Sequence, residues 1–223
     1  MEQQVKGIIV KLIDYKEADK LASIFSLEQG LITAKFTGVK RDKAKLKSVA
    51  MPFTFANFSL FEKKEHLTVT NADVIDNFPA LLQDYNKTIC GYIILDIIRT
   101  ILPKQKPEQD IFLLTVSALK KLEQSNEYIS TIDYILKFIT LSGMGLKFAE
   151  LNYVYLDTFT GNFCEERVEG AIQIDKKVYE ILKDINDEKQ VEINPTKLKQ
   201  SLRLLHNILF VKFGEDVTSF QYL

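Results

Sequence analysis

The stretch 5-VKGIIVKLIDYKEADKLASIFSLEQGLITAKFTGV-39 decides the fold. It holds three runs of strand length that are rich in β-branched and aromatic residues, at 5–15, 20–27 and 30–39. Short polar clusters that contain charged residues or glycine separate these runs, as expected for tight turns. The stretch therefore predicts three consecutive antiparallel strands at the start of the chain.

Two more strands are predicted at 53–61 and 66–75. The first of them alternates, so that Phe55 and Asn57 point to one face while Ala56 and Phe58 point to the other. Five short strands within about 75 residues are typical of a small barrel of the OB type. An SH3-like barrel has much the same pattern, and the pattern by itself does not separate the two.

The pattern changes from strands to helices after 77-NFP-79. The predicted helices lie at 80–102, 108–125, 128–143, 175–187 and from Asn194 onward. Asn194 is a good N-cap and Pro195 suits the first helical position. An irregular insert is expected at about 148–174. The fold class is thus α+β, with a small antiparallel barrel of the OB type at 1–79 and an all-helical domain at 80–223.

The composition is that of a globular protein. Hydrophobic residues make up 46% of the 223 residues, and the formal net charge is −1. The N-terminal MEQQVKG lacks the apolar core of a signal peptide. The most apolar run, 89–102, is interrupted by Asp96 and Arg99 and is shorter than the ~20 residues that cross a bilayer. We therefore expect a cytoplasmic protein that does not enter a membrane.

No motif for catalysis is present in the sequence. It contains no GxSxG elbow, no phosphate-binding GxxxxGK[ST] loop and no GxGxxG after a strand. His66 and His206 stand alone, and with Cys90 and Cys164 they lack the paired spacing of a zinc site. We therefore predict no catalytic residue, no metal and no cofactor, and we favour binding over enzymatic activity.

The strongest functional signal is the basic segment 35-KFTGVKRDKAKLKS-48. It holds one acidic and six basic residues in a chain that is nearly neutral. Lysine and arginine neutralise phosphates and release counterions, which provides affinity for nucleic acid without reading its sequence. A solvated, mobile loop would have the same composition. The residues predicted to bind DNA are Lys35, Lys40, Arg41, Lys43, Lys45 and Lys47.

Aromatic residues flank the basic segment at Phe36, Phe53, Phe55 and Phe58. Barrels of this class hold single strands by combining a basic groove with aromatic rings on which the bases stack. About half of these rings must face the core of any barrel, so they cannot all be stacking platforms.

Further candidates for partner binding lie in the helical part. Lys199, Arg203 and His206 share one face of the last predicted helix, and Arg99 lies in the long apolar helix. A solvated helix face is the better explanation of the stripe. An acidic peptide or phosphates would also fit Arg99, Lys199 and Arg203.

The order of these segments resembles the RecO family of bacterial recombination mediators. The resemblance starts at 7–46, where Tyr15, Glu17 and Asp19 match the family's Tyr-x-Glu-x-Asp turn and Gly30 opens the next strand. Thr37-Gly38-Val39-Lys40-Arg41 matches its basic loop, Pro52-Phe53 its Pro-Phe pair, and 72-ADVIDNFP-79 its last strand. The helical remainder agrees in order and length.

Two features depart from that family. Thr37 stands where a lysine is usual, and many members carry a four-cysteine zinc site in the irregular segment, where this chain has only Cys164. Arg167 occupies the position of a C-x-x-C partner, so zinc is not carried over. We hypothesise that aromatic packing replaces the metal, through Tyr153, Tyr155, Phe159 and Phe163.

The resemblance implies a protein of DNA repair and recombination that acts in the response to DNA damage. Such proteins bind single- and double-stranded DNA, anneal complementary strands, engage the acidic C-terminal tail of the single-strand binding protein and, with RecR, help load RecA. Two alternatives stay open. One is an OB-fold adaptor that binds only proteins, and the other is a nucleic-acid enzyme whose site is assembled from distant carboxylates.

Overall fold

The computed structural model describes residues 2–223, and the chain divides into two compact units. Unit 1 comprises residues 1–80 and 95–113, and unit 2 comprises residues 81–94 and 114–223. The units group residues by their contacts, whereas a domain is a part that could fold alone. The domain boundary near residue 79 therefore stays a prediction.

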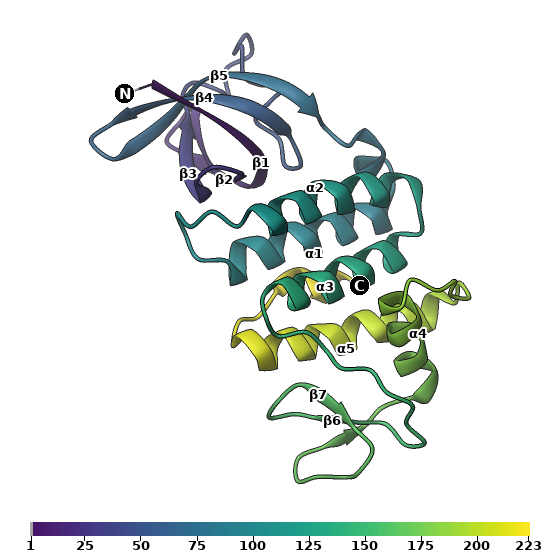
Figure 1. Cartoon of the computed structure of the whole chain (residues 1–223). Coiled ribbons are helices and arrows are strands. Elements are labelled where there is room, and N and C mark those ends of the chain that lie inside the picture. Colours follow the sequence, from purple (N-terminus) through teal and green to yellow (C-terminus); the bar gives the residue numbers. More distant parts are fainter. Residues whose placement is uncertain (1) are drawn as a thin grey trace. The chain divides into compact units, whose positions relative to one another are not determined.

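Unit 1 contains a closed five-stranded barrel with the strand order β1-β2-β3-β5-β4 (Figure 1). Four of the pairings are antiparallel, and a short parallel pairing of Ala34 with Leu67 and Lys35 with Thr68 closes the barrel between β3 and β5. The fold class predicted from the sequence, an OB-type barrel followed by helices, is thereby confirmed. The strands are β1 (Glu2–Tyr15), β2 (Asp19–Ser26), β3 (Gly30–Phe36), β4 (Phe55–Lys63) and β5 (His66–Asp76).

The alternation predicted for β4 places its side chains as expected. Ala56, Phe58 and Leu60 are fully buried inside the barrel, and Asn57 on the other face is exposed. Phe55 is also buried, although it belongs to the outer face. The reason is Phe112, whose ring centroid lies 6.1 Å from that of Phe55.

Phe112 belongs to α2 (Gln109–Gln124) and connects the helical segment 95–113 to the outside of the barrel. Its ring also lies 5.5 Å from that of Phe25 on β2. Because the three rings bury one another, residues 95–113 belong to the same compact unit as the strands.

Four of the five helices begin within one residue of their predicted starts, whereas the first begins at Tyr85 rather than at residue 80, and a 3-10 turn precedes it. Their bounds are α1 (Tyr85–Ile101), α2 (Gln109–Gln124), α3 (Glu127–Leu141), α4 (Lys176–Asn186) and α5 (Pro195–Phe213), with 3-10 turns η1 (Pro79–Leu82) and η2 (Thr218–Tyr222). The predicted cap of α5 is present, since the side chain of Asn194 accepts a hydrogen bond from the amide of Lys197 at 3.1 Å. No helix among residues 2–223 combines the length and apolarity needed to cross a bilayer.

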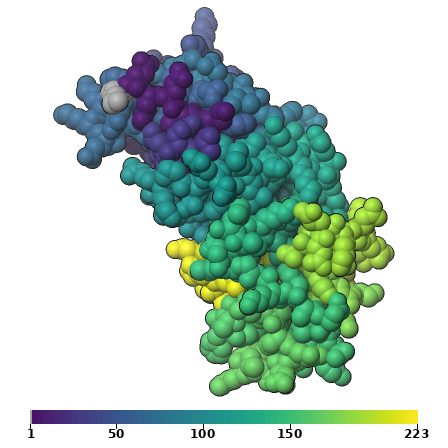
Figure 2. All heavy atoms as spheres, in the orientation of Figure 1, coloured from purple at the N-terminus to yellow at the C-terminus, as the bar shows by residue number. Residues whose placement is uncertain are grey.

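Unit 2 has its own core between α3, α4 and α5. The leucine face predicted on α5 is buried throughout, at Leu198, Leu202, Leu205 and Leu209. The irregular segment of this unit contains a small sheet that the sequence did not predict, with the order β7-β6-β8. Its strands are β6 (Tyr155–Asp157), β7 (Asn162–Cys164) and β8 (Ile172–Gln173). In the space-filling view the green atoms of this region gather at one end of unit 2 (Figure 2).

Candidate nucleic-acid interface

The basic segment 35–48 is a folded part of the barrel. Its backbone runs through successive turns, with the amide of Arg41 bonded to the carbonyl of Gly38 at 3.1 Å and that of Ala44 to the carbonyl of Arg41 at 3.1 Å. Val39 and Val49 are buried in the barrel core at the two ends of these turns. The charged side chains between these anchors are therefore held at the surface.

The start of the segment is tied to the turn between β1 and β2. A carboxylate oxygen of Asp19 accepts a hydrogen bond from the amide of Gly38 at 2.7 Å, and the amide of Lys40 donates to the carbonyl of Ala18 at 2.9 Å. Gly38 has a φ of +65°, a conformation that glycine adopts without steric cost. Asp19, at the start of β2, thus positions the basic segment.

The six basic side chains differ in their surroundings. Lys40 pairs with Asp14 at 2.8 Å and lowers the pKa of that carboxyl, mainly through its hydrogen bond. Lys47 lies 3.7 Å from Asp42, and Lys45 donates to the side-chain oxygen of Asn71 at 3.1 Å. Arg41, Lys43 and Lys35 form no side-chain hydrogen bond or ion pair with any residue in 2–223. These three charges are available to a ligand without breaking a contact.

The phenylalanines beside the segment belong to the core. Phe36, Phe53 and Phe58 are fully buried and Phe55 is 6% exposed. None of them can stack on a base, so any stacking platform must come from another part of the barrel.

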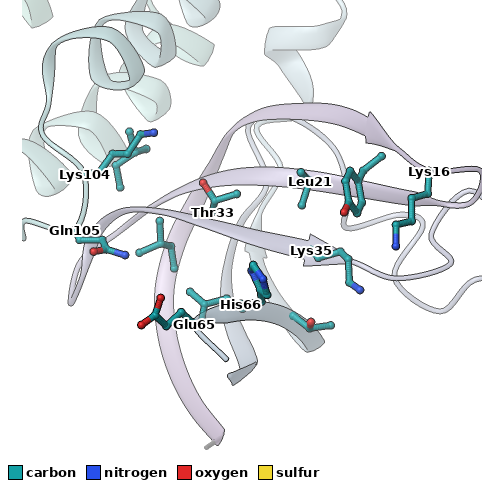
Figure 3. Close-up of a pocket in the computed structure, with 13 residues that line it drawn as sticks. Lys16, Leu21, Thr33, Lys35, Glu65, His66, Lys104 and Gln105 are labelled. Carbon is teal, nitrogen blue, oxygen red and sulfur yellow. The ribbon is translucent and has the colours of Figure 1, made fainter. Parts of the chain in front are cut away.

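A groove on the outer face of the barrel supplies such a surface. Two adjoining cavities of about 640 and 300 Å³ share Leu21, Leu31, Thr33 and Lys104 as lining residues, and together we call them the barrel groove. Figure 3 shows residues that line the larger cavity. The larger cavity lies over β2 and β3 and reaches both the β1–β2 turn and the β4–β5 turn. OB folds bind oligonucleotides on this face and with these two loops.

Positive charge dominates the lining of the barrel groove. Its basic side chains are Lys11, Lys16, Lys35, Arg99 and Lys104, and Glu65 is its only acidic residue. Arg99 is already paired with Asp96, because its Nε donates a hydrogen bond to the Asp96 carboxylate at 2.8 Å. The rings of Tyr15 and His66 also line the groove, and Tyr15 is 39% exposed. The groove thus combines cations with two exposed rings.

Of the predicted DNA-binding residues, only Lys35 lines the barrel groove. The sequence did not predict a binding role for Lys16, Lys104, Tyr15 or His66, because they are distant in the chain and meet only when the barrel closes. The OB topology was the one available signal, since the β1–β2 turn that contains Lys16 takes part in binding in that fold.

The candidate partner-binding residues are each in contact with their own chain. Arg99 belongs to unit 1, whereas Lys199 and Arg203 belong to unit 2. The ammonium group of Lys199 lies 5.5 Å from the centroid of the Tyr128 ring, and Arg203 donates to the carbonyl of Leu223 at 3.1 Å.

Unit 2 contains another basic cavity, which we call the hairpin pocket. It has a volume of about 570 Å³ and lies between the turn at Gly143, the β6–β7 hairpin and the end of α5. Lys147 and Lys212 line it together with apolar side chains that include Met144, Phe163 and Val211, and no acidic residue takes part. Burial lowers the pKa of Lys212, whose ammonium group donates to the side chain of Asn162 at 3.1 Å.

The irregular segment, where the resemblance raised the question of a zinc site, is organised by aromatic rings. Phe163 lies 4.9 Å from Tyr179 and 5.6 Å from Phe148. The hydroxyl of Tyr179 both donates to the carbonyl and accepts from the amide of Ala149, at 3.0 Å each. Phe163 packs among these rings as expected and Tyr155 is half-buried, whereas Tyr153 and Phe159 are 65% and 75% exposed. That this packing takes the place of a metal stays a hypothesis.

Cys164 is the single cysteine of this segment. Burial raises the pKa of its thiol, and its sulfur lies 3.3 Å from the carbonyl oxygen of Glu166. Within residues 2–223, no group of three or more His, Cys, Asp or Glu side chains is arranged to hold a metal ion.

Comparison with known proteins matches both parts of the chain to family models. Residues 1–78 match the model for the N-terminal part of recombination protein O, and residues 82–219 match the model for its C-terminal part. The chain is also similar to curated proteins that are named DNA repair protein RecO. The protein of Clostridium perfringens is 27% identical, over 81% of this chain and 78% of that relative. The Clostridium novyi protein is 25% identical, over 81% and 75%, and the Clostridium acetobutylicum protein is 26% identical, over 78% and 67%.

Proposed function

Because the chain belongs to the RecO family, we propose that it is a cytoplasmic mediator of DNA recombination and repair. In this role it binds single- and double-stranded DNA, anneals complementary strands and, with RecR, helps load RecA. The observation that carries the proposal is the closed OB-type barrel, whose surface presents the basic segment and the barrel groove. Annealing needs two strands to be held while their charges are screened, and it breaks no covalent bond.

The basic segment suits binding to the phosphate backbone. The side chains of Arg41 and Lys43 are exposed and form no ion pair with any residue from 2 to 223. Phosphates could therefore pair with both cations without displacing a carboxylate. Lys40 would exchange Asp14 for a phosphate. Since this binding does not read bases, it is compatible with single and double strands alike.

We also propose that unit 2 receives the acidic C-terminal tail of the single-strand binding protein. The hairpin pocket supports this, because the ammonium groups of Lys147 and Lys212 stand beside apolar side chains and face no acidic lining residue. Arg99, Lys199 and Arg203 remain candidates for the same partner, but each would first have to leave its present contact.

The proposal is tested by titrating a labelled oligonucleotide with the full chain at low and moderate salt, and then mixing complementary strands. We expect binding that weakens steeply with salt and annealing that is faster than that of the free strands. Negligible binding at low salt would favour an adaptor that binds proteins only. Cleavage of the DNA after addition of Mg²⁺ or Mn²⁺ would instead indicate an enzyme.

A further inference from the structure

The connection between α1 and α2, residues 102–108, lies against the barrel within unit 1. The amide of Gln105 donates to the carbonyl of Leu31 at 3.1 Å, and Lys104 forms an isolated parallel bridge with Leu31. The connection therefore extends the sheet beside the start of β3.

Gly30 makes this close approach possible. A Cβ atom at this position would lie 2.0 Å from the carbonyl oxygen of Lys106, and the φ of Gly30 is +70°. Both facts exclude a larger residue without movement of the connection. The position of Lys104 is thus fixed by the barrel, even though it follows a helix in the sequence.

Lys104 consequently stands at one end of the barrel groove. Its side chain lines both cavities, while Lys16 and Lys35 lie toward the other end of the larger one (Figure 3). None of these three lysines forms an ion pair with any residue from 2 to 223. Leu21 is half-buried and lines the groove between them, Leu31 lines it as a buried residue that is only 5% exposed, and Tyr15 and His66 add their rings.

This arrangement fits a single strand better than a duplex. Free bases can contact the side chain of Leu21 and stack on exposed rings, while the phosphates meet the lysines at either end. In a duplex the bases are paired and stacked inside, so that only its phosphates would contact the groove.

We propose that the connection 102–108 forms one wall of a single-strand binding site and that Lys104 binds a phosphate of a strand lying in the barrel groove. This inference rests on the proposed function. It extends the DNA-binding surface beyond the residues 1–79 to which the sequence assigned it.

The test compares Lys104→Gln with Lys106→Gln in the full chain, using fluorescence anisotropy of a labelled oligothymidine. Both changes remove one charge from an exposed lysine of the same connection, but only Lys104 lines the groove. For Lys104→Gln we expect affinity to fall by roughly three- to tenfold and the salt slope to decrease by about one. For Lys106→Gln, whose ammonium group pairs with Glu108 at 2.7 Å, we expect affinity close to that of the wild type.

The outcomes separate the two proposals. If the wild type binds and both variants lose affinity equally, the connection acts only through its general charge and the inference is overturned. It is also overturned if Lys104→Gln binds like the wild type. If the wild type itself does not bind the oligonucleotide, the proposed function fails as well. A greater effect of Lys104→Gln on the single strand than on a duplex of equal length is the result expected from the geometry.

Discussion

Arg41 and Lys40 are neighbours in the basic segment, but only Lys40 has a carboxylate partner, which is Asp14. Exposed pairs of this kind contribute little to stability. Reversing both charges should therefore leave the fold intact while placing two carboxylates where phosphates would lie. The pair is consequently suited to a test of binding that is not confounded by unfolding.

For Lys40→Glu/Arg41→Glu we expect the affinity for single- and double-stranded DNA to fall by more than roughly tenfold. The slope of log affinity against log salt concentration should decrease by about two, because two phosphate contacts are lost. Anisotropy titrations at several salt concentrations measure both. The control is Lys176→Glu/Lys177→Glu, which makes the same charge change at an exposed pair on α4. Unchanged affinity and slope in the first variant would remove the basic segment from the interface.

Cys90 gives a prediction about stability and pH. The residue is fully buried on α1, and this burial raises the pKa of its thiol from 9.0 to about 12. Below pH 9 the thiol is neutral in both the folded and the unfolded chain. Above pH 9 it ionises in the unfolded chain only, so its contribution to stability is lost as the pH rises toward 12.

The raised pKa of Cys90 lowers the free energy of unfolding at high pH by at most about 4 kcal/mol, because each pKa unit corresponds to about 1.4 kcal/mol. Cys90→Ala removes the thiol and with it this dependence of stability on pH. At pH 8 the variant should be less stable than the wild type by about 1 kcal/mol, because the substitution leaves a small cavity. We expect the difference between the two in urea denaturation to vanish near pH 10 and to reverse in sign above it, because only the wild type loses about 1.4 kcal/mol for each further pH unit. A difference that stays constant over this range contradicts the prediction.

The strands of the barrel could be predicted because each one is rich in β-branched or aromatic residues and ends at a polar turn. β2 and β3 begin within one residue of their predicted starts. The sheet of β6, β7 and β8 was missed because strands of two or three residues have no detectable period. What organises this segment is contact with distant rings at Phe148 and Tyr179.

The same difference between local patterns and distant contacts explains which residues of the candidate site could be predicted. The basic segment is a run of adjacent residues, so composition revealed it. The barrel groove joins Lys16 from a turn, Lys35 from β3 and Lys104 from the connection after α1. No local pattern relates these three residues, and only the closure of the barrel and the docking of the connection bring them together.

The aromatic contacts of β7 lead to a prediction for this element. Phe163→Ala removes the ring that contacts both Phe148 and Tyr179, and we expect the free energy of unfolding to fall by roughly 1–3 kcal/mol. Hydrogen exchange of the amides in β6 and β7 should accelerate. Phe159→Ala, in the same hairpin but at an exposed ring, should change stability by less than about 0.5 kcal/mol. Equal effects of the two substitutions would show that the cluster does not hold the sheet.

At the scale of the whole molecule, the two proposed binding functions fall on different compact units. The basic segment and the barrel groove belong to unit 1, and the hairpin pocket belongs to unit 2. The chain is nearly neutral, with a formal charge of −1, so a general attraction to acidic molecules does not follow from its net charge. Binding of DNA and of an acidic peptide should therefore depend on local charge.

This separation predicts that each function can be removed without the other. Lys147→Glu/Lys212→Glu places two carboxylates in the hairpin pocket, so we expect the acidic tail peptide to lose at least roughly tenfold in affinity while the DNA affinity stays within about twofold. Lys40→Glu/Arg41→Glu should have the opposite effect. Titrating both variants with labelled peptide and with labelled DNA gives four affinities from one pair of proteins. If the variant in unit 2 also loses DNA binding, the DNA path continues onto that unit. If its peptide affinity is unchanged, the tail binds elsewhere, and Arg99, Lys199 and Arg203 become the residues to substitute next.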